Sequence, residues 1–120
     1  MVGIDEIGAL RKLVCPEFTG TFSYDETNAA EQIAFTLTLT YSVNIGGIWL
    51  DMVNVTQATT IRYKHQIDGT NYRTFYTGAW AVADDDGVLL QPFSAYRNVQ
   101  VTLQCGGGGA GNVNVPYAVV

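Results

Sequence analysis

The clearest chemical signature in the sequence lies near the end of the chain. Residues 106 to 111 read GGGGAG and satisfy the pattern G-x-G-x-x-G, which in dinucleotide-binding proteins leads from a strand into a helix whose first turn holds a pyrophosphate. Here residues 113 to 119 instead alternate in the manner of a strand. No acidic residue follows Gly111 to bind a ribose, and no Lys-Ser or Lys-Thr pair completes a P-loop. We therefore expect a mobile glycine-rich loop between the last two strands and no nucleotide site.

Three consecutive aspartates, Asp84 to Asp86, precede Gly87 and are a candidate metal site. Calcium prefers several carboxylate oxygens on a tight turn, but an EF-hand spaces its ligands and closes with a glutamate. Three adjacent side chains in a turn cannot all point at one ion. We expect a solvated turn that leads into a strand, with no bound metal and no cofactor.

The residues that could act as base or nucleophile lie in unfavourable places for catalysis. His65, the only histidine, falls on the apolar side of a strand predicted over 59 to 67, and we expect it to be a hydrogen-bonded core or interface residue. Cys105 alternates with apolar residues and is typical of a small buried hydrophobe. Whether it pairs with Cys15 does not follow from two positions so far apart. Nothing sets two carboxylates at a working distance, so the sequence predicts a protein that is not an enzyme.

Composition and charge exclude several classes of partner. Hydrophobic residues make up 48% of the chain and charged residues 14%, against about 25% charged in ordinary soluble domains. The net charge is −5 and the six basic residues are scattered, which disfavours nucleic-acid binding. No apolar run is long enough to span a membrane, and the first residues lack the basic-then-apolar order of a secretory signal. We expect a cytoplasmic protein whose weakly charged surface contacts other proteins.

The elements that must position these residues begin with a short arm over residues 1 to 17. Ile4, Ile7, Leu10 and Val14 recur at helical spacing over residues 3 to 14, and Pro16 ends the pattern. A helix of this length is marginal in isolation. Its apolar stripe must therefore pack on the body of the protein or on a neighbouring subunit.

From residue 18 to residue 120 the apolar period is two, which predicts one all-β domain. The first strand contains Phe22 and Tyr24. The other predicted strands cover 32 to 43, Ile48 to Val55, 59 to 67, 72 to 76, 88 to 90, 99 to 105 and 113 to 119. Eight short strands favour an antiparallel β-sandwich with jelly-roll topology, and an up-and-down barrel is the alternative. The predicted core residues are Ile33, Phe35, Leu37, Leu39, Ile61, Tyr63, Val101 and Leu103.

Four segments of the second half of the chain carry a resemblance to a known class of proteins. They are IDGTNYR at 67 to 73, DDDGVLL at 84 to 90, VQVTLQ at 99 to 104 and NVPYAVV at 114 to 120. Roughly residues 60 to 120 resemble small all-β structural proteins encoded by tailed bacterial and archaeal viruses. The resemblance implies a virion component without catalytic residues or cofactor. It would be a capsid decoration (cement) protein that oligomerises and binds the major capsid protein, or a tail or head-completion protein, assembled in the host cytoplasm.

Assembly is thus the expected mechanism, and two segments are its main candidate contacts. They are the apolar stripe of the arm and the glycine loop, together with two aromatic residues. The predicted interface residues are Ile4, Ile7, Leu10, Gly106, Gly107, Gly108, Gly109, Gly111, Trp80 and Tyr96. An alternative function is a carbohydrate-binding or receptor-binding module, in which Trp80, Tyr72 and the acidic turn would face a glycan.

Overall fold

The computed structural model describes residues 18–40, 42–95 and 97–120, and these fold as ten strands. The strands are β1 (Phe18–Asp25), β2 (Gln32–Leu37), β3 (Val43–Ile45), β4 (Ile48–Asp51), β5 (Thr59–His65), β6 (Arg73–Trp80), β7 (Gly87–Leu90), β8 (Phe93–Ala95), β9 (Val99–Gln104) and β10 (Asn112–Val119). The helix expected over residues 3 to 14 lies outside the described residues. Every pair of neighbouring strands is antiparallel.

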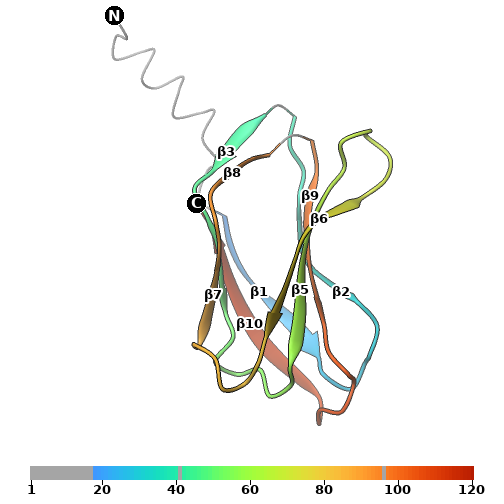
Figure 1. The fold of residues 1–120 in the computed structure, drawn as a ribbon, viewed down its shortest axis with the longest axis vertical. Helices are drawn as coiled ribbons and strands as arrows, with labels where there is room; N and C mark the ends of the chain where they lie inside the picture. The colour runs from blue at the N-terminus through green and yellow to red at the C-terminus, as the bar shows by residue number, and fades with distance from the viewer. Residues whose placement is uncertain (1–17, 41, 96) are drawn as a thin grey trace, which may run out of the picture.

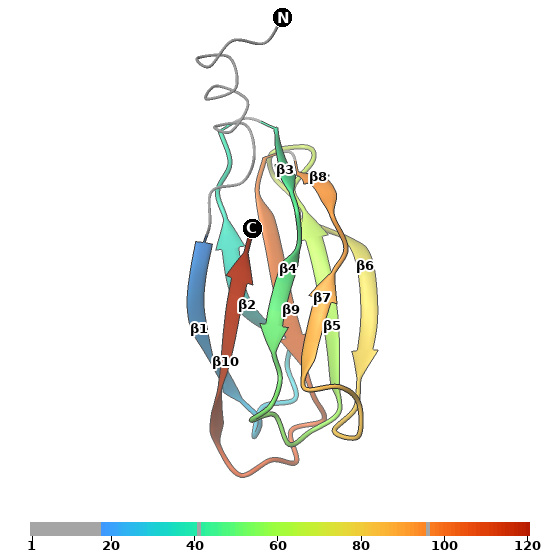
Figure 2. The ribbon, with the colours of Figure 1, turned by 90° about the vertical axis from the view of Figure 1, so that its left-hand side faces the viewer.

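The strands form two four-stranded sheets that pack face to face (Figure 1). One sheet has the order β1-β10-β4-β7, which Figure 2 shows from left to right, and the other has the order β2-β9-β5-β6. The short pair β3-β8 continues the ladder of β4 and β7, because β3 precedes β4 and β8 follows β7 along the chain. When each of these continuations is counted with its neighbour, eight strands remain in the order of a jelly roll. The predicted sandwich is confirmed, with two sheets in place of the alternative barrel.

The core lies between the sheets and is filled by alternate residues of each strand. In β5 the burial alternates without a break, so that Thr59, Ile61, Tyr63 and His65 face inward. Of the predicted core residues, Phe35, Leu37, Ile61, Tyr63, Val101 and Leu103 are buried and Leu39 packs partly buried against them. Side chains of both sheets thus share one continuous core.

The strand predicted over 32 to 43 is too long, and Ile33, which was predicted to face the core, faces outward. β2 ends at Leu37, and the pairing with β9 shifts register between Ile33 and Phe35. A register shift of one residue turns the side chain to the other face of the sheet, and Ile33 is accordingly 53% exposed. Residues 43 to 45 belong to β3 instead, which pairs with β8. No strand was predicted at the position of β8.

Candidate functional site: an apolar strip around one edge of the sandwich

Both sheets end on the same side of the sandwich in a strand that has only one neighbour. β6 pairs with β5 alone and β7 pairs with β4 alone. A cavity of about 410 Å³, here called the edge cleft, lies between these two edge strands. An edge strand presents unpaired N–H and C=O groups to any chain that approaches it, so this side of the sandwich combines free backbone with a hollow between the sheets.

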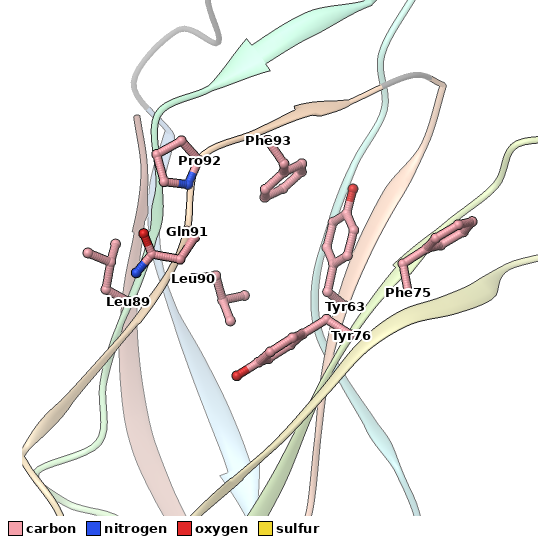
Figure 3. Close-up of a pocket in the computed structure, with 8 residues that line it drawn as sticks. All are labelled: Tyr63, Phe75, Tyr76, Leu89, Leu90, Gln91, Pro92 and Phe93. Carbon is pink, nitrogen blue, oxygen red and sulfur yellow. The ribbon is translucent and has the colours of Figure 1, made fainter.

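The edge cleft is lined mainly by aromatic and aliphatic side chains (Figure 3). Tyr63 from β5 and Phe93 from β8 pack ring to ring at the inner end, with centroids 4.4 Å apart. Tyr76 of β6 extends into the space toward Leu90 of β7. The polar atoms among the lining side chains are the tyrosine hydroxyls and the amide of Gln91, so the cleft suits an apolar group with few hydrogen bonds to make.

His65 lies beside the cleft and is a buried, hydrogen-bonded residue, as predicted. Its Nδ1 lies 3.1 Å from the hydroxyl of Tyr63, and its ring meets Phe75 edge to face. Burial raises the pKa of the Tyr63 hydroxyl above its ordinary value, so this group stays protonated. The pair therefore fixes the orientation of the aromatic rings beside the cleft.

A second hollow lies on the outer face of the β1-β10-β4-β7 sheet. This outer groove has a volume of about 350 Å³ and its lining includes Trp49, Asp51, Asp86, Pro116 and Ala118. Trp49 is 52% exposed, a large fraction for a tryptophan, which is usually well buried. The groove is thus an apolar surface with two carboxylates in its lining.

Leu89 joins the edge cleft to the outer groove. It lines the cleft and lies directly opposite Trp49 across the β4-β7 ladder, where side chains contact one another. Trp49 in turn lies opposite Ala118 of β10. One apolar strip therefore runs around β7, formed by Phe75, Tyr76, Leu89, Trp49, Pro116 and Ala118.

The outer face of the β2-β9-β5-β6 sheet has a different character. Glu31 accepts a hydrogen bond from Arg62 at 2.8 Å and another from Lys64, and Gln104 also accepts from Arg62. Burial would raise the pKa of the Glu31 carboxyl, but the hydrogen bonds and charges of Lys64 and Arg62 outweigh it and lower that pKa. This face is charged and internally paired, whereas the strip around β7 is apolar.

The glycine loop is held against the turn between β1 and β2. The amide of Gly109 donates to the carbonyl of Glu26 at 3.0 Å, and the amide of Glu26 donates to the carbonyl of Gly111 at 3.1 Å. The buried carboxylate of Glu26 accepts from the amide and the hydroxyl of Thr56, which ties both segments to the β4-β5 loop. The expectation of a mobile loop does not fit these bonds. The residues after the loop form β10, so the helix that a nucleotide site requires is replaced by a strand, as predicted.

Of the predicted interface residues, the five glycines and Trp80 can be placed. Gly106 and Gly108 are exposed and Gly107, Gly109 and Gly111 are half-buried. Trp80 is 6% exposed, belongs to the core, and donates its indole N–H to the carbonyl of Asp85 at 2.8 Å. The remaining interface predictions, on Ile4, Ile7, Leu10 and Tyr96, fall outside the described residues.

The acidic turn and Cys105 have structural roles. A carboxylate oxygen of Asp84 accepts from the amide of Ala81 at 2.7 Å and so closes its own turn. In the part of the chain that the structure describes, no group of three or more histidine, cysteine, aspartate or glutamate side chains could hold a metal ion. The buried thiol of Cys105 faces the carbonyls of Glu26 and Asn28. Cys15, whose pairing with Cys105 the sequence left open, lies outside the described residues.

Trp49 and Leu89 were not among the predicted interface residues, although the sequence contains a pattern that places them on an outer face. Trp49 stands between the buried Ile48 and Leu50 on β4, and Leu89 stands between the half-buried Val88 and the buried Leu90 on β7. Alternation along a strand places such a residue on the outer face. An exposed aromatic or aliphatic residue at that position indicates a contact surface.

Comparisons with known proteins give a likeness among solved structures only. No family model matches the chain, and no curated protein matches it. In the described residues no helix is long and apolar enough to cross a membrane. Among solved structures, the chain is similar to a mitogen from Yersinia pseudotuberculosis, with 12% sequence identity and a TM-score of 0.46 over 88% of this chain and 83% of the mitogen chain. The identity and the score are too low to indicate a family or a function.

Proposed function

We propose that this chain is a non-enzymatic virion structural protein, a capsid decoration protein that oligomerises and binds the viral shell through protein–protein contacts. The observation that carries the proposal is the apolar strip around β7, which places Trp49, Phe75 and Tyr76 in solvent at about half their surface. Aromatic residues of this kind dominate the free energy of protein interfaces. Monomeric proteins rarely expose so many of them side by side.

The jelly-roll order of the strands is compatible with this role, because viral capsid domains and lectins both use it. Fold alone does not define a function. The low charge of the chain also supports a role in protein contacts. The charged residues on the outer face of the β2-β9-β5-β6 sheet pair with one another, so this face suits solvent, whereas the apolar strip suits contact with another protein.

The test is the mass of the purified protein in solution, measured by light scattering over a range of concentrations, for the wild type and two variants. The double variant Trp49→Ser with Leu89→Ser removes the centre of the strip. About half of each side chain is still exposed in the monomer, so burying the rest of both stabilises a contact by about 1.5–3 kcal/mol, and the dissociation constant of the double variant should rise at least about tenfold.

The matched control is Ile33→Ser, which removes an equally exposed apolar side chain from the opposite sheet. It should leave both the assembly and the melting temperature unchanged. A wild-type mass of 13.0 kDa at all concentrations would contradict oligomerisation, and equal losses in the two variants would contradict the role of the strip.

Trp49 also favours a second candidate function, a carbohydrate-binding module. Its exposed ring stands beside Asp51 and Asp86 in the outer groove, and sugar rings stack on aromatic faces while carboxylates accept hydrogen bonds from hydroxyl groups. In the carbohydrate-binding alternative expected from the sequence, Trp80 would face the glycan, but Trp80 is buried. If the chain binds carbohydrate through Trp49, a glycan of a test panel should quench the tryptophan fluorescence, and Trp49→Phe should abolish the quenching. If no glycan quenches the fluorescence, the carbohydrate-binding candidate is contradicted and assembly remains.

A further inference from the structure

We propose that the free edge of β6 pairs with β6 of a second copy, antiparallel and about a two-fold axis at Thr77, so that two four-stranded sheets join into one. The proposal rests on the oligomerisation proposed above and names its contact. Three observations support it: the exposure of β6, the side chains at its centre, and the charges at its two ends.

β6 is the most exposed of the strands that end a sheet in the described part of the chain. Five consecutive residues, 73 to 77, are exposed, and so is Ala79. By contrast, β7 has only four residues, and β1 and β2 have a buried or half-buried residue at about every second position. β6 contains no lysine, proline or acidic residue, although such residues commonly protect an edge from pairing. Figure 2 shows this strand at the right-hand margin of the molecule, where a second copy can approach it.

The regular part of β6 determines where the axis lies. The ladder with β5 shifts register between Thr74 and Tyr76 of β6. A bulge can protect an edge strand, but this one lies at Phe75 and leaves residues 76 to 80 regularly paired. The new ladder is therefore centred within this regular segment.

The side chains at the centre fit an axis at Thr77. Tyr76 of each copy then lies opposite Gly78 of the other, because paired residues are equally far from the axis. An added Cβ at Gly78 would lie 2.5 Å from the hydroxyl oxygen of Tyr76, so the tyrosine ring already lies along the strand over the glycine. The two Tyr76 rings would thus lie side by side at about the strand spacing of 4.8 Å, where aromatic rings attract one another.

The charges at the two ends of β6 are complementary in an antiparallel pair. Arg73 is exposed at the first residue of the strand, and the turn after the strand exposes the aspartates at 84 to 86. The turn before the strand also contains an acid, Asp68, near Arg73. Its charge is offset by Arg97, whose guanidinium lies against Gly69 in the same turn. The positive end of each strand therefore meets the negative end of the other, twice in each dimer.

The axis at Thr77 also brings these charges within reach of each other. It places Arg73 opposite Ala81 of the second copy, since both are equally far from the axis. The carboxylate of Asp84 accepts a hydrogen bond from the amide of Ala81 at 2.7 Å, so the acidic turn lies beside this position. Within one copy the length of the strand, about 23 Å, separates Arg73 from the same turn. The attraction therefore acts between copies.

The first experiment replaces Thr77 by cysteine. Thr77 is exposed and pairs with the outward-facing Arg62. On the axis it meets its own copy, and the Cα atoms of directly opposite residues are about 4.5–5.5 Å apart, a distance that a disulfide spans. Thr77→Cys should therefore give a disulfide-linked dimer after mild oxidation, which a gel without reducing agent detects.

The matched control is Thr74→Cys, which is exposed on the same side of the same strand. Its two copies would lie about 20 Å apart in the dimer, so it should form no more bridge than the wild type. The wild type is the baseline for any bridge through Cys15 or Cys105. Equal bridging by both variants would overturn the pairing.

Light scattering on the wild type separates the two proposals. Oligomers in which Thr77→Cys forms no more bridge than Thr74→Cys would overturn the β6 pairing and leave the proposed oligomerisation in place. The edge of β6 would then be open to a strand of another protein. A wild-type monomer at all concentrations would overturn both proposals.

The second experiment exchanges the charges. Arg73→Asp should raise the dissociation constant of the dimer about tenfold, because each dimer contains this exposed ion pair twice. Adding Asp85→Arg should restore the wild-type value. The matched control adds Asp25→Arg instead, which makes the same change of charge on β1 and should not restore it. Equal rescue by both arginines would overturn the proposed contact between the ends of β6.

Discussion

Replacing Gly109 by alanine should destabilise the fold strongly, because the glycine loop packs on the β1-β2 turn without room for a side chain. An added Cβ would overlap with Cβ of Glu26 and lie 3.1 Å from its carbonyl oxygen. Neither atom is the end of a flexible side chain, so the backbone of one segment must move.

The expected magnitude follows from two contributions. Overpacking of this kind costs about 1–3 kcal/mol, and the loss of the bond from Gly109 to the carbonyl of Glu26 costs about 0.5–1.5 kcal/mol. The free energy of unfolding should fall by about 2–4 kcal/mol. At about 4 °C per kcal/mol for a domain of this size, the melting temperature should fall by about 8–16 °C.

The control lies in the same loop. A Cβ at Gly106 would meet no atom within 4 Å, and Gly106 does not need a positive φ. Gly106→Ala should therefore keep the wild-type stability or gain up to about 1 kcal/mol from the stiffer unfolded chain. Urea unfolding and thermal melting of both variants provide the measurement. Equal stability of Gly109→Ala and Gly106→Ala would refute the packed loop and restore the mobile one.

Three further results are expected. Thr102→Val should raise the free energy of unfolding by about 1–2 kcal/mol in urea unfolding, because the Thr102 hydroxyl is buried and has no hydrogen-bond partner among the described residues; a loss of stability would point to a partner for this hydroxyl. The hydrogen bond from the backbone amide of Asn71 is the main cause that lowers the pKa of Asp68 from 3.8 to about 2. The ionised carboxylate of Asp68 therefore contributes to stability above pH 3.8, and this contribution is lost as the pH falls through about 2. Carboxyl titration by NMR should give that midpoint, the stability of Asp68→Asn should vary less between pH 4 and pH 2 than that of the wild type, and a midpoint at the ordinary value would contradict the turn geometry. Trp80→Phe should cost about 1–3 kcal/mol in thermal melting, since it removes the bond to the carbonyl of Asp85 and leaves a small cavity, and a neutral result would mean that this indole is not part of the core.

Local sequence patterns predicted those strands in which buried and exposed residues alternate without interruption by the neighbouring strands. β5 is the clearest case, where the alternation of inward and outward residues was read directly from the sequence. The turn after β5 was also predicted from a local signal, the dipeptide Asp68-Gly69. Gly69 has the positive φ that such a turn requires.

Features that depend on a partner strand could not be predicted in this way. The side on which Ile33 lies depends on a register shift against β9, and β8 is a strand only because β3 pairs with it. The edge cleft depends on which two strands lie last in their sheets, a property of the whole topology. The residues of the apolar strip come from strands that are far apart in the sequence, so no local pattern could predict that they lie together.

The pairing of the strands has a consequence for how the protein is made. β1 pairs only with β10, and β2 pairs only with β9, so the first two strands wait for residues 99 to 119 before they gain a partner. Among the strands of the described residues, β5 and β6 are the one pair of sheet neighbours that are consecutive in the chain, and we expect this hairpin to form first. During synthesis the apolar strands of the first half would stay exposed until residues 99 to 119 have left the ribosome. Folding of this domain should therefore be slow, and its yield in the cell should depend on chaperones.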